Sequence, residues 1–531
     1  MNFYKEKYDA IVIGGALSGM SCALTLASKG KDVLVLERHN LPGGLTTSFV
    51  RGGLEMEATL HEMMSIGPKD KPLKIRTFLE EMGVMVDWLR VPEAYRIYVP
   101  KEEIDITLHA GFSGSIENDI FVPGDFVMAK EIDAKYKGTF KEVNRLMNLC
   151  AEVYNSVNVL SVNKTSKVQM LLKHSSFVKT AGYSTNDVLG TFDLPQEVLD
   201  ILKAYWIYVG SPFSDLPFTI YAVLMADYFI CGSYVCKEFS HELSVRMQER
   251  CEELGVQYEY GQNVEKILVK NGHVYGVRTT RGDEIHADYV ACSAYPNTCY
   301  GKMIEPLSEV PFRAYQDVNA REMGLTVVSV VLTLDKSPKE LNIHDYSVFS
   351  SESDMDLDKF FEQGKGLGPY DYLTTICLNY ANPNCTREGE TSLSITYLPS
   401  PLGFMKITAD NYHEIKRKIA KDMIETVSSH LGVNLFDHIL EVEVEMPHSV
   451  AHYTSNFLGG IYGYKHSMKD HIIARLQMCD DENYIKGLSF CGAHAISGDG
   501  MSPCITNGRK AASILLEQMK EEIKWQRLKA L

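Results

Sequence analysis

The chain has 531 residues, of which 45% are hydrophobic and 23% are charged. That balance is typical of a globular protein with a large buried core, and it excludes a disordered chain, a coiled coil and a collagen-like fibre. The formal net charge of −16 repels phosphate backbones, so we expect no nucleic-acid partner.

Targeting and cysteine patterns bear on the location of the protein. No apolar run reaches the ~18 residues that a membrane-spanning helix needs, and the longest, residues 324–334, is β-branched and predicts a buried strand. The charged first residues show no secretory signal. The twelve cysteines are scattered without a CxxC pair or zinc-type spacing, which indicates reduced thiols and no metal site. We therefore expect a cytoplasmic protein.

Residues 8–36 predict one strand–helix–strand unit. Residues 8–13 are a short apolar run of the kind found in buried parallel strands, residues 20–29 have the composition of a helix, and residues 32–36 form a second apolar run. A glycine-containing turn, residues 14–19, joins the first strand to the helix. Such a unit sets the helix N-terminus beside the carboxyl ends of the strands, where nucleotides bind.

The turn and the end of the second strand have the features of a dinucleotide site. Gly14 permits the tight turn, Gly19 lets the helix pack on the sheet, and the helix N-terminus attracts a pyrophosphate. Glu37 can accept hydrogen bonds from a ribose diol. Ala16 stands where the pattern has glycine, although Gly15 beside it restores some freedom. The expected contacts are Gly14, Gly15, Ala16, Ser18, Gly19 and Glu37.

A second glycine pair, Gly43-Gly44, follows Glu37. It lets the chain approach a pyrophosphate again, as an extended FAD requires; the alternative is a surface Pro-Gly-Gly turn. Here the sequence resembles the flavoprotein superfamily of amine oxidases, phytoene desaturases, carotenoid isomerases and retinol saturases, with Leu45 where these families often have arginine. The resemblance implies FAD as the cofactor, and it adds to the contacts Arg38, Gly43, Gly44, Leu45 and Thr46.

Two distant segments carry the same resemblance. Residues 255–294 predict three strands joined by turns, and the resemblance puts Val264 against the adenine. Residues 487–492 predict a strand that leads through a glycine-rich loop into a helix over residues 504–519, whose N-terminus would face the flavin. The contacts implied there are Gly492 at the ribityl-phosphate arm and Gly500, Met501 and Ser502 at the flavin ring.

Shorter motifs narrow the resemblance to the phytoene desaturase, carotenoid isomerase and retinol saturase branch. They lie at residues 57–61, 171–189 and 447–463, while residues 231–234 fit only in part. The implied fold class is α/β, with a Rossmann-type, glutathione reductase-like FAD-binding domain and a second α+β substrate domain. The expected FAD-binding domain takes residues 1–70, 235–300 and 480–531, and the substrate domain takes residues 71–234 and 301–479.

Two features bear on the substrate and its chemistry. Residues 204–234 are rich in aromatic side chains, which indicates either the wall of a tunnel for a long apolar substrate or core packing between helices. Flavin chemistry also needs a group that donates or accepts a proton. The candidates expected near the ring are His61, Glu62, Tyr453 and Asp499, followed by Glu57 and His494.

The predicted function is redox chemistry or isomerisation at carbon–carbon double bonds of a lipophilic polyene or isoprenoid. The sequence has no second dinucleotide motif, so we expect an external electron donor or acceptor. A flavin amine oxidase and a non-catalytic escort protein for prenylated partners, both on this fold, remain open alternatives. Residues 521–531 combine basic and apolar side chains and could lie on an anionic membrane surface or form an ordinary helix end.

Overall fold

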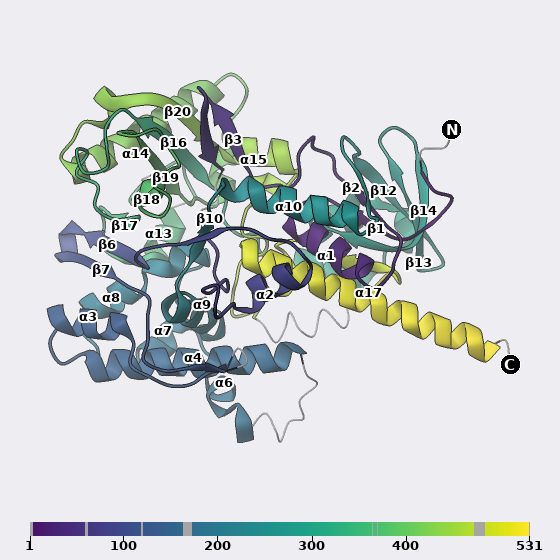
Figure 1. Cartoon of the computed structure of the whole chain (residues 1–531), viewed down its shortest axis with the longest axis horizontal. Helices are drawn as coiled ribbons and strands as arrows, with labels where there is room; N and C mark the ends of the chain where they lie inside the picture. The colour runs from purple at the N-terminus through teal and green to yellow at the C-terminus, as the bar shows by residue number, and fades with distance from the viewer. Residues whose placement is uncertain are drawn as a thin grey trace.

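Parallel pairing of apolar strands forms the centre of the first sheet (Figure 1). β1 (Tyr8–Ile13) pairs with β2 (Val33–Leu36) and is joined to it by α1 (Leu17–Ala27), which is the unit that the sequence predicts. β14 (Glu284–Cys292) pairs in parallel with the other side of β1. The computed structural model describes residues 4–58, 62–117, 120–162, 172–363, 365–368, 370–471 and 484–529.

The rest of the first sheet comes from distant parts of the chain. β12 (Val264–Lys270) and β13 (His273–Thr279) form an antiparallel hairpin next to β14. Asn271 and Gly272 in its turn both have positive φ, as a two-residue hairpin of this kind needs. The sheet is completed by β11 (Gln257–Glu259) beside β2, β15 (Ile304–Glu305) beside β12, and β21 (Leu488–Phe490) beside β14.

The C-terminal helix α17 (Met501–Lys529) packs closely on α1, and Figure 1 shows it in yellow running past α1 toward the C-terminus. Gly508 permits this approach, because a Cβ atom added there would lie 1.9 Å from the carbonyl oxygen of Ser18. Ser21 Oγ donates a hydrogen bond to the Ile505 carbonyl at the same contact (3.0 Å). The first helix of the chain and the first turns of the C-terminal helix are therefore packed together.

The second sheet has the order β20-β16-β19-β18-β17-β6-β7. β16 (Val328–Leu334) is the buried strand expected within residues 324–334, and all seven of its residues are buried. It pairs antiparallel with the strands on both sides. The other strands are β6 (Tyr95–Val99), β7 (Ile104–Leu108), β17 (Ser347–Ser351), β18 (Tyr372–Cys377), β19 (Thr391–Tyr397) and β20 (Ile439–Glu445).

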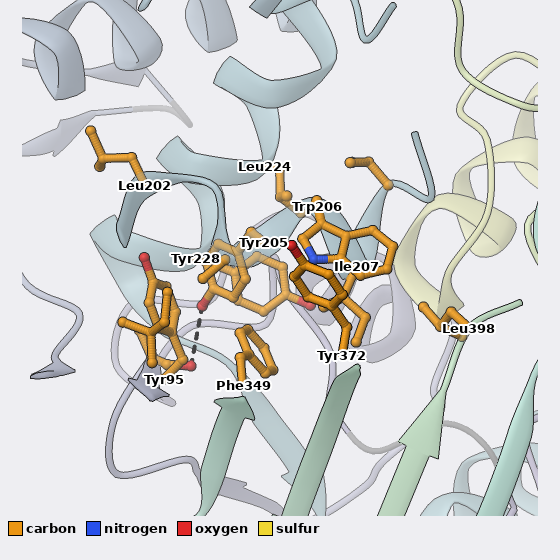
Figure 2. Close-up of a cluster of buried hydrophobic side chains, with 14 of the residues drawn as sticks. Tyr95, Leu202, Tyr205, Trp206, Ile207, Leu224, Tyr228, Phe349, Tyr372 and Leu398 are labelled. Atoms are coloured by element: carbon orange, nitrogen blue, oxygen red, sulfur yellow. Dashed lines mark hydrogen bonds between the residues drawn. The ribbon is translucent and has the colours of Figure 1, made fainter. Parts of the chain in front are cut away.

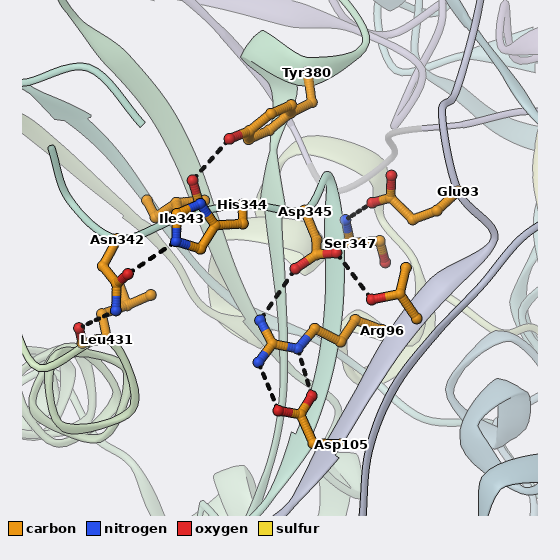
Figure 3. Close-up of polar contacts among 11 residues, drawn as sticks. Glu93, Arg96, Asp105, Asn342, Ile343, His344, Asp345, Ser347, Tyr380 and Leu431 are labelled. Atoms are coloured by element: carbon orange, nitrogen blue, oxygen red, sulfur yellow. Dashed lines mark hydrogen bonds and ion pairs between the residues drawn. The ribbon is translucent and has the colours of Figure 1, made fainter. Parts of the chain in front are cut away.

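Polar contacts hold one edge of the second sheet together (Figure 3). Arg96 of β6 forms a two-bond ion pair with Asp105 of β7, with N–O distances of 2.7 and 3.0 Å, and also contacts Asp345 at 3.1 Å. The Ser347 N–H group at the start of β17 donates to the buried carboxylate of Glu93 at 2.9 Å. These contacts tie β6, β7 and β17 to one another.

Helices and short hairpins surround the two sheets. The described helices include none that is both long and apolar enough to cross a membrane. The larger ones are α2 (Lys74–Glu81), α3 (Val127–Lys135), α4 (Phe140–Val162), α9 (Phe218–Cys231), α10 (Phe239–Glu253), α12 (Phe312–Asn319), α14 (Tyr412–Leu431) and α15 (Pro447–Thr454). The shorter elements are β3 (Ser48–Arg51), β4 (Leu54–Glu57), β5 (Trp88–Arg90), β8 (Ile116–Glu117), β9 (Ile120–Phe121), β10 (Tyr234–Cys236), α6 (Ser175–Thr180), α7 (Thr185–Leu189), α8 (Gln196–Leu202), α11 (Pro296–Thr298) and α13 (Leu357–Gln363).

The domain boundaries drawn from the sequence stay a prediction. The expected FAD-binding segments do contribute strands to the first sheet. α2 also packs in the apolar cluster beneath that sheet, through Ile75 and Phe78. β15 and α12 pack in the cluster on its other side, through Ile304 and Ala314.

The contact between α1 and α17 yields a stability prediction. Gly508→Val should lower the free energy of unfolding by about 1–3 kcal/mol, because the new side chain must displace the backbone of α1. Thermal unfolding of the purified protein measures the effect. Gly301→Ala is the matched control, since a Cβ atom there meets nothing within 4 Å. Equal unfolding temperatures for the two variants would contradict the packing argument.

Candidate active site

A cavity of about 980 Å³ is lined by residues of both sheets, and its volume lies at the upper end of the range for small-molecule sites. Gly15 and Gly19 do not line it, and His61 lies outside the described residues. Glu57 does not line it either, and the other residues singled out from the sequence do: Gly14, Ala16, Ser18, Glu37, Arg38, Gly43, Gly44, Leu45, Thr46, Glu62, Val264, Tyr453, Gly492, His494, Asp499, Gly500, Met501 and Ser502.

The first glycine turn brings the uncapped N-terminus of α1 to the cavity. Gly14 has φ +97°, and a Cβ atom there would lie 2.0 Å from Ser293 Oγ. A Cβ atom on Gly19 would lie 1.9 Å from the Gly14 carbonyl oxygen, so glycine is needed for the helix to pack there. Ala16 precedes the helix without a side-chain cap. The first-turn N–H groups are therefore available to an anion.

The second glycine pair packs directly against the first turn. The Gly43 N–H group donates to the Gly15 carbonyl at 2.9 Å, and Ala16 forms a parallel bridge with Gly43. A Cβ atom on Gly44 would lie 3.0 Å from the Ala16 methyl group. The missing side chain at Gly44 thus makes room for the alanine that replaces the middle glycine of the motif, a compensation between distant positions that the sequence pattern did not reveal.

Glu37 is 8% exposed and is fixed by two backbone donors. Its Oε2 atom accepts from the Gly15 N–H group at 2.6 Å, and its Oε1 atom accepts from the His39 N–H group at 2.7 Å. Each oxygen keeps a further lone pair. The carboxylate could therefore also accept hydrogen bonds from a diol in the cavity.

The loop before α17 is held by a residue that sequence reasoning missed as a site residue. Asn507 is 1% exposed, and its side-chain amide donates to the carbonyl oxygens of Gly492 and Gly498, both at 3.0 Å. Its Oδ1 atom accepts from the Ser497 N–H group at 2.8 Å. This amide fixes the loop that leads to the start of α17. The sequence feature that could have identified Asn507 is a polar side chain on the face of the helix that packs against the protein.

Two of the candidates for proton transfer, Glu57 and Tyr453, contact other parts of the chain. Glu57 does not line the cavity; its carboxylate accepts hydrogen bonds from the N–H group (2.8 Å) and the hydroxyl group of Ser240. Tyr453 is 56% exposed, and its ring contacts the edge of His39, two residues after Glu37, at 5.7 Å between centroids. The structure therefore brings Tyr453 to the segment that follows Glu37.

Glu62 is the buried acid of the cavity wall. It is 9% exposed, and its Oε1 atom accepts a hydrogen bond from the Tyr208 hydroxyl at 3.0 Å. Burial raises the pKa of Glu62 to about 8, although the hydrogen bond from Tyr208 opposes the rise. At neutral pH the side chain is therefore largely a neutral acid that can donate a proton.

Asp499 and His494 lie in the cavity wall formed by the C-terminal loop. Asp499 Oδ1 is 3.3 Å from Nε2 of His466, which is 5% exposed. His494 is 3% exposed, and its ring packs against Tyr295 at 5.4 Å between centroids. Its packing is that of a structural histidine, whereas the carboxylate of Asp499 has a buried imidazole beside it.

The aromatic stretch over residues 204–234 contributes side chains both to the cavity wall and to core packing. Tyr208 and Tyr228 line the cavity and stack on each other, with centroids 5.3 Å apart and an interplanar angle of 13°. Trp206 packs instead against Phe360 at 4.9 Å and Tyr372 at 5.5 Å. Figure 2 shows Trp206 and Tyr372 packed together within the aromatic cluster.

A family model described as flavin containing amine oxidoreductase matches residues 17–516. Prolycopene isomerase of Daucus carota is 22% identical over 97% of this chain and 81% of its own length. All-trans-retinol 13,14-reductase of Rattus norvegicus is 24% identical over 67% of this chain and 58% of its own length. Putrescine oxidase solved with putrescine superposes with a TM-score of 0.63 at 13% identity, covering 96% of this chain and 99% of the other.

The fold and the match define a flavoprotein of the α/β class, as expected from the sequence. The chain belongs to the flavin containing amine oxidoreductase family. It is an FAD-dependent oxidoreductase. The uncapped helix N-terminus, the two glycine turns and the fixed Glu37 carboxylate suit the pyrophosphate and ribose of this cofactor.

The position of Glu37 gives a test of cofactor binding. Glu37→Arg should abolish FAD retention, because the variant replaces an acceptor with a cation and frees two backbone N–H groups. FAD retention is measured by the ratio of flavin absorbance to protein absorbance after purification. Glu6→Arg, on the exposed N-terminal segment, controls for the change of charge. Full flavin content in Glu37→Arg would contradict the ribose contact.

Proposed function

We propose that this chain acts on carbon–carbon double bonds of a long lipophilic polyene or isoprenoid, with Glu62 as the acid that delivers the proton. The observation that carries the proposal is a buried, largely neutral carboxyl group in the wall of a cavity that also has apolar lining. The activities named for the similar prolycopene isomerase and retinol reductase support it. A donating acid favours saturation or isomerisation over desaturation.

The proposed cofactor site uses the residues expected from the sequence. The adenosine and pyrophosphate part would be held by the two glycine turns, Glu37 and Val264, and the ring by the C-terminal loop around Gly500. The proposed contacts are Gly14, Gly15, Ala16, Ser18, Gly19, Glu37, Arg38, Gly43, Gly44, Leu45, Thr46, Val264, Gly492, Gly500, Met501 and Ser502. Support comes from the shared cavity that most of these residues line.

The cofactor and the side chains of the protein contribute different parts of the reaction. When bound, FAD exchanges a hydride with the substrate at its ring. Glu62 would donate a proton to one carbon of the double bond, and in saturation the hydride for the neighbouring carbon would come from the cofactor. In isomerisation the same carboxyl group takes the proton back, and no electrons are transferred overall. Tyr208 holds the Glu62 carboxyl by its hydrogen bond, and Ile207 and Leu224 contribute apolar side chains to the cavity lining.

Saturation consumes two electrons per turnover, so it needs an external electron donor. The proposed substrate dissolves in membranes, and residues 521–531 are the part of the chain whose basic and apolar composition suits contact with an anionic surface. A cytoplasmic enzyme that meets a membrane peripherally remains our prediction. Asp499 and Tyr453, and His61 outside the described residues, remain secondary candidates for proton transfer.

Glu62→Gln should lower turnover about 100-fold or more while FAD content stays unchanged. Turnover is measured chromatographically, with chemically reduced enzyme and either all-trans-retinol or a cis polyene. Glu57→Gln is the matched control, because burial also raises the pKa of Glu57 to about 8 but this residue does not line the cavity. Equal losses in the two variants, or release of hydrogen peroxide with amines in place of polyene turnover, would contradict the proposal.

The same assignment predicts a pH profile. Glu62 donates only when protonated, so turnover should be constant below about pH 8 and fall above it. Tyr208→Phe removes a hydrogen bond that favours the ionised carboxylate, so the pKa rises and the fall moves to higher pH. A profile that is unchanged in Tyr208→Phe would assign the titration to another group.

A further inference from the structure

One row of polar side chains crosses the cavity face of the second sheet. The register pairs Glu445 of β20 with Ser329 of β16, Ser329 with Thr396 of β19, and Thr396 with Thr374 of β18. Directly paired residues of neighbouring strands point to the same face of a sheet. Glu445, Thr396 and Thr374 line the cavity, and Ser329 lies between them in the row.

The polar atoms of this row have no hydrogen-bond partner among the described residues. They are Glu445 Oε2, Ser329 Oγ, Thr396 Oγ1 and Thr374 Oγ1, and all four atoms are buried. Thr374 is 5% exposed and Thr396 is 8% exposed. Buried polar groups without partners cost free energy, and nearly all of them in proteins are paired. A ligand with its own hydrogen-bonding group would pair them.

The surroundings of the row are apolar. Ile376, two residues from Thr374 on β18, also lines the cavity. So do Leu398, just past the end of β19, and Val327, just before the start of β16. Leu398 also appears with Ile207 and Leu224 of the cavity wall in Figure 2. The row is therefore a polar band in an apolar part of the cavity, where a hydrocarbon would leave every member unpaired.

The charged neighbours of the row limit the chemistry of that group. Burial and the neighbouring Glu443 raise the pKa of Glu445 to about 7, so near neutral pH its carboxyl group can donate or accept a hydrogen bond. Glu443 is 3.0 Å from Arg51 and 4.0 Å from Lys416, and the charge of Lys416 also opposes the rise in the pKa of Glu445. Within the row, a ligand carboxylate would be repelled by Glu445 when that group is ionised, whereas a hydroxyl group can both donate and accept.

We propose that this row binds the hydroxyl group of the substrate, which makes the substrate a polyene alcohol instead of a hydrocarbon or a carboxylic acid. The inference rests on the proposed function and adds the polar group that fixes the substrate along the cavity. Thr374 and Thr396 supply hydroxyl groups and Glu445 a carboxyl group. These side chains determine specificity, and the proton transfer stays with Glu62.

Binding to the oxidised, FAD-loaded enzyme tests the inference without turnover. The probes are all-trans-retinol, the hydrocarbon in which hydrogen replaces its hydroxyl group, and the corresponding acid, each titrated in the same detergent while the visible flavin spectrum is followed. The alcohol should bind about tenfold more tightly than the hydrocarbon or the acid. Equal affinities for the alcohol and the hydrocarbon would overturn this inference but would leave the proposed function standing. If none of the three binds, the proposed function falls as well.

Substitutions in the row test whether these side chains, and no other part of the cavity, bind the hydroxyl group. Thr374→Val with Thr396→Val should reduce the preference for alcohol over hydrocarbon to about twofold or less, mainly by weakening alcohol binding. Thr375→Val is the matched control, because this neighbour of Thr374 points to the opposite face and does not line the cavity. A preference that survives the double substitution would show that the hydroxyl group binds elsewhere.

Discussion

Parallel pairing of β2, β1, β14 and β21 brings four chain segments to one edge of the first sheet, and the rest of the site depends on that alignment. Parallel strands share the direction of their carboxyl ends, so Gly14, Glu37, Ser293 and Gly492, which follow these strands closely, meet at the same cavity. Segments near the start, middle and end of the chain thereby contribute to one site.

The groups that line the cavity differ between the first sheet and the second sheet. At the first sheet it presents backbone donors and the Glu37 carboxylate, which suit a charged cofactor. At the second sheet it presents Ile376, Leu398 and the stacked pair of Tyr208 and Tyr228. Glu62 also lines this cavity, where its carboxyl group accepts a hydrogen bond from Tyr208.

Local patterns predicted the elements that local rules control. The strand–helix–strand unit of residues 8–36, the Asn271-Gly272 hairpin and the buried strand β16 each follow from periodicity and turn chemistry over a few residues. The family resemblance supplied the FAD site and the C-terminal loop. The match over residues 17–516 confirms the flavin cofactor, whereas the individual contacts stay a prediction.

Features that join distant residues could not be predicted from the sequence. The accommodation of Ala16 by Gly44 depends on how two loops pack, and the row from Glu445 to Thr374 depends on the register of four strands. Glu57 and Glu62 are both candidate acids in the sequence. Only the fold shows that Glu57 is hydrogen-bonded to Ser240, whereas Glu62 lies in the cavity wall.

The most direct measurement is an anaerobic visible spectrum of the reduced enzyme mixed with a polyene alcohol. A saturase should regain the oxidised flavin band in step with loss of the polyene, and an isomerase should keep reduced flavin while the polyene changes geometry. A flavin that stays reduced above an unchanged polyene, together with reduction of the oxidised enzyme by amines, would contradict action on carbon–carbon double bonds. Purified protein without a flavin band would contradict the enzyme assignment itself.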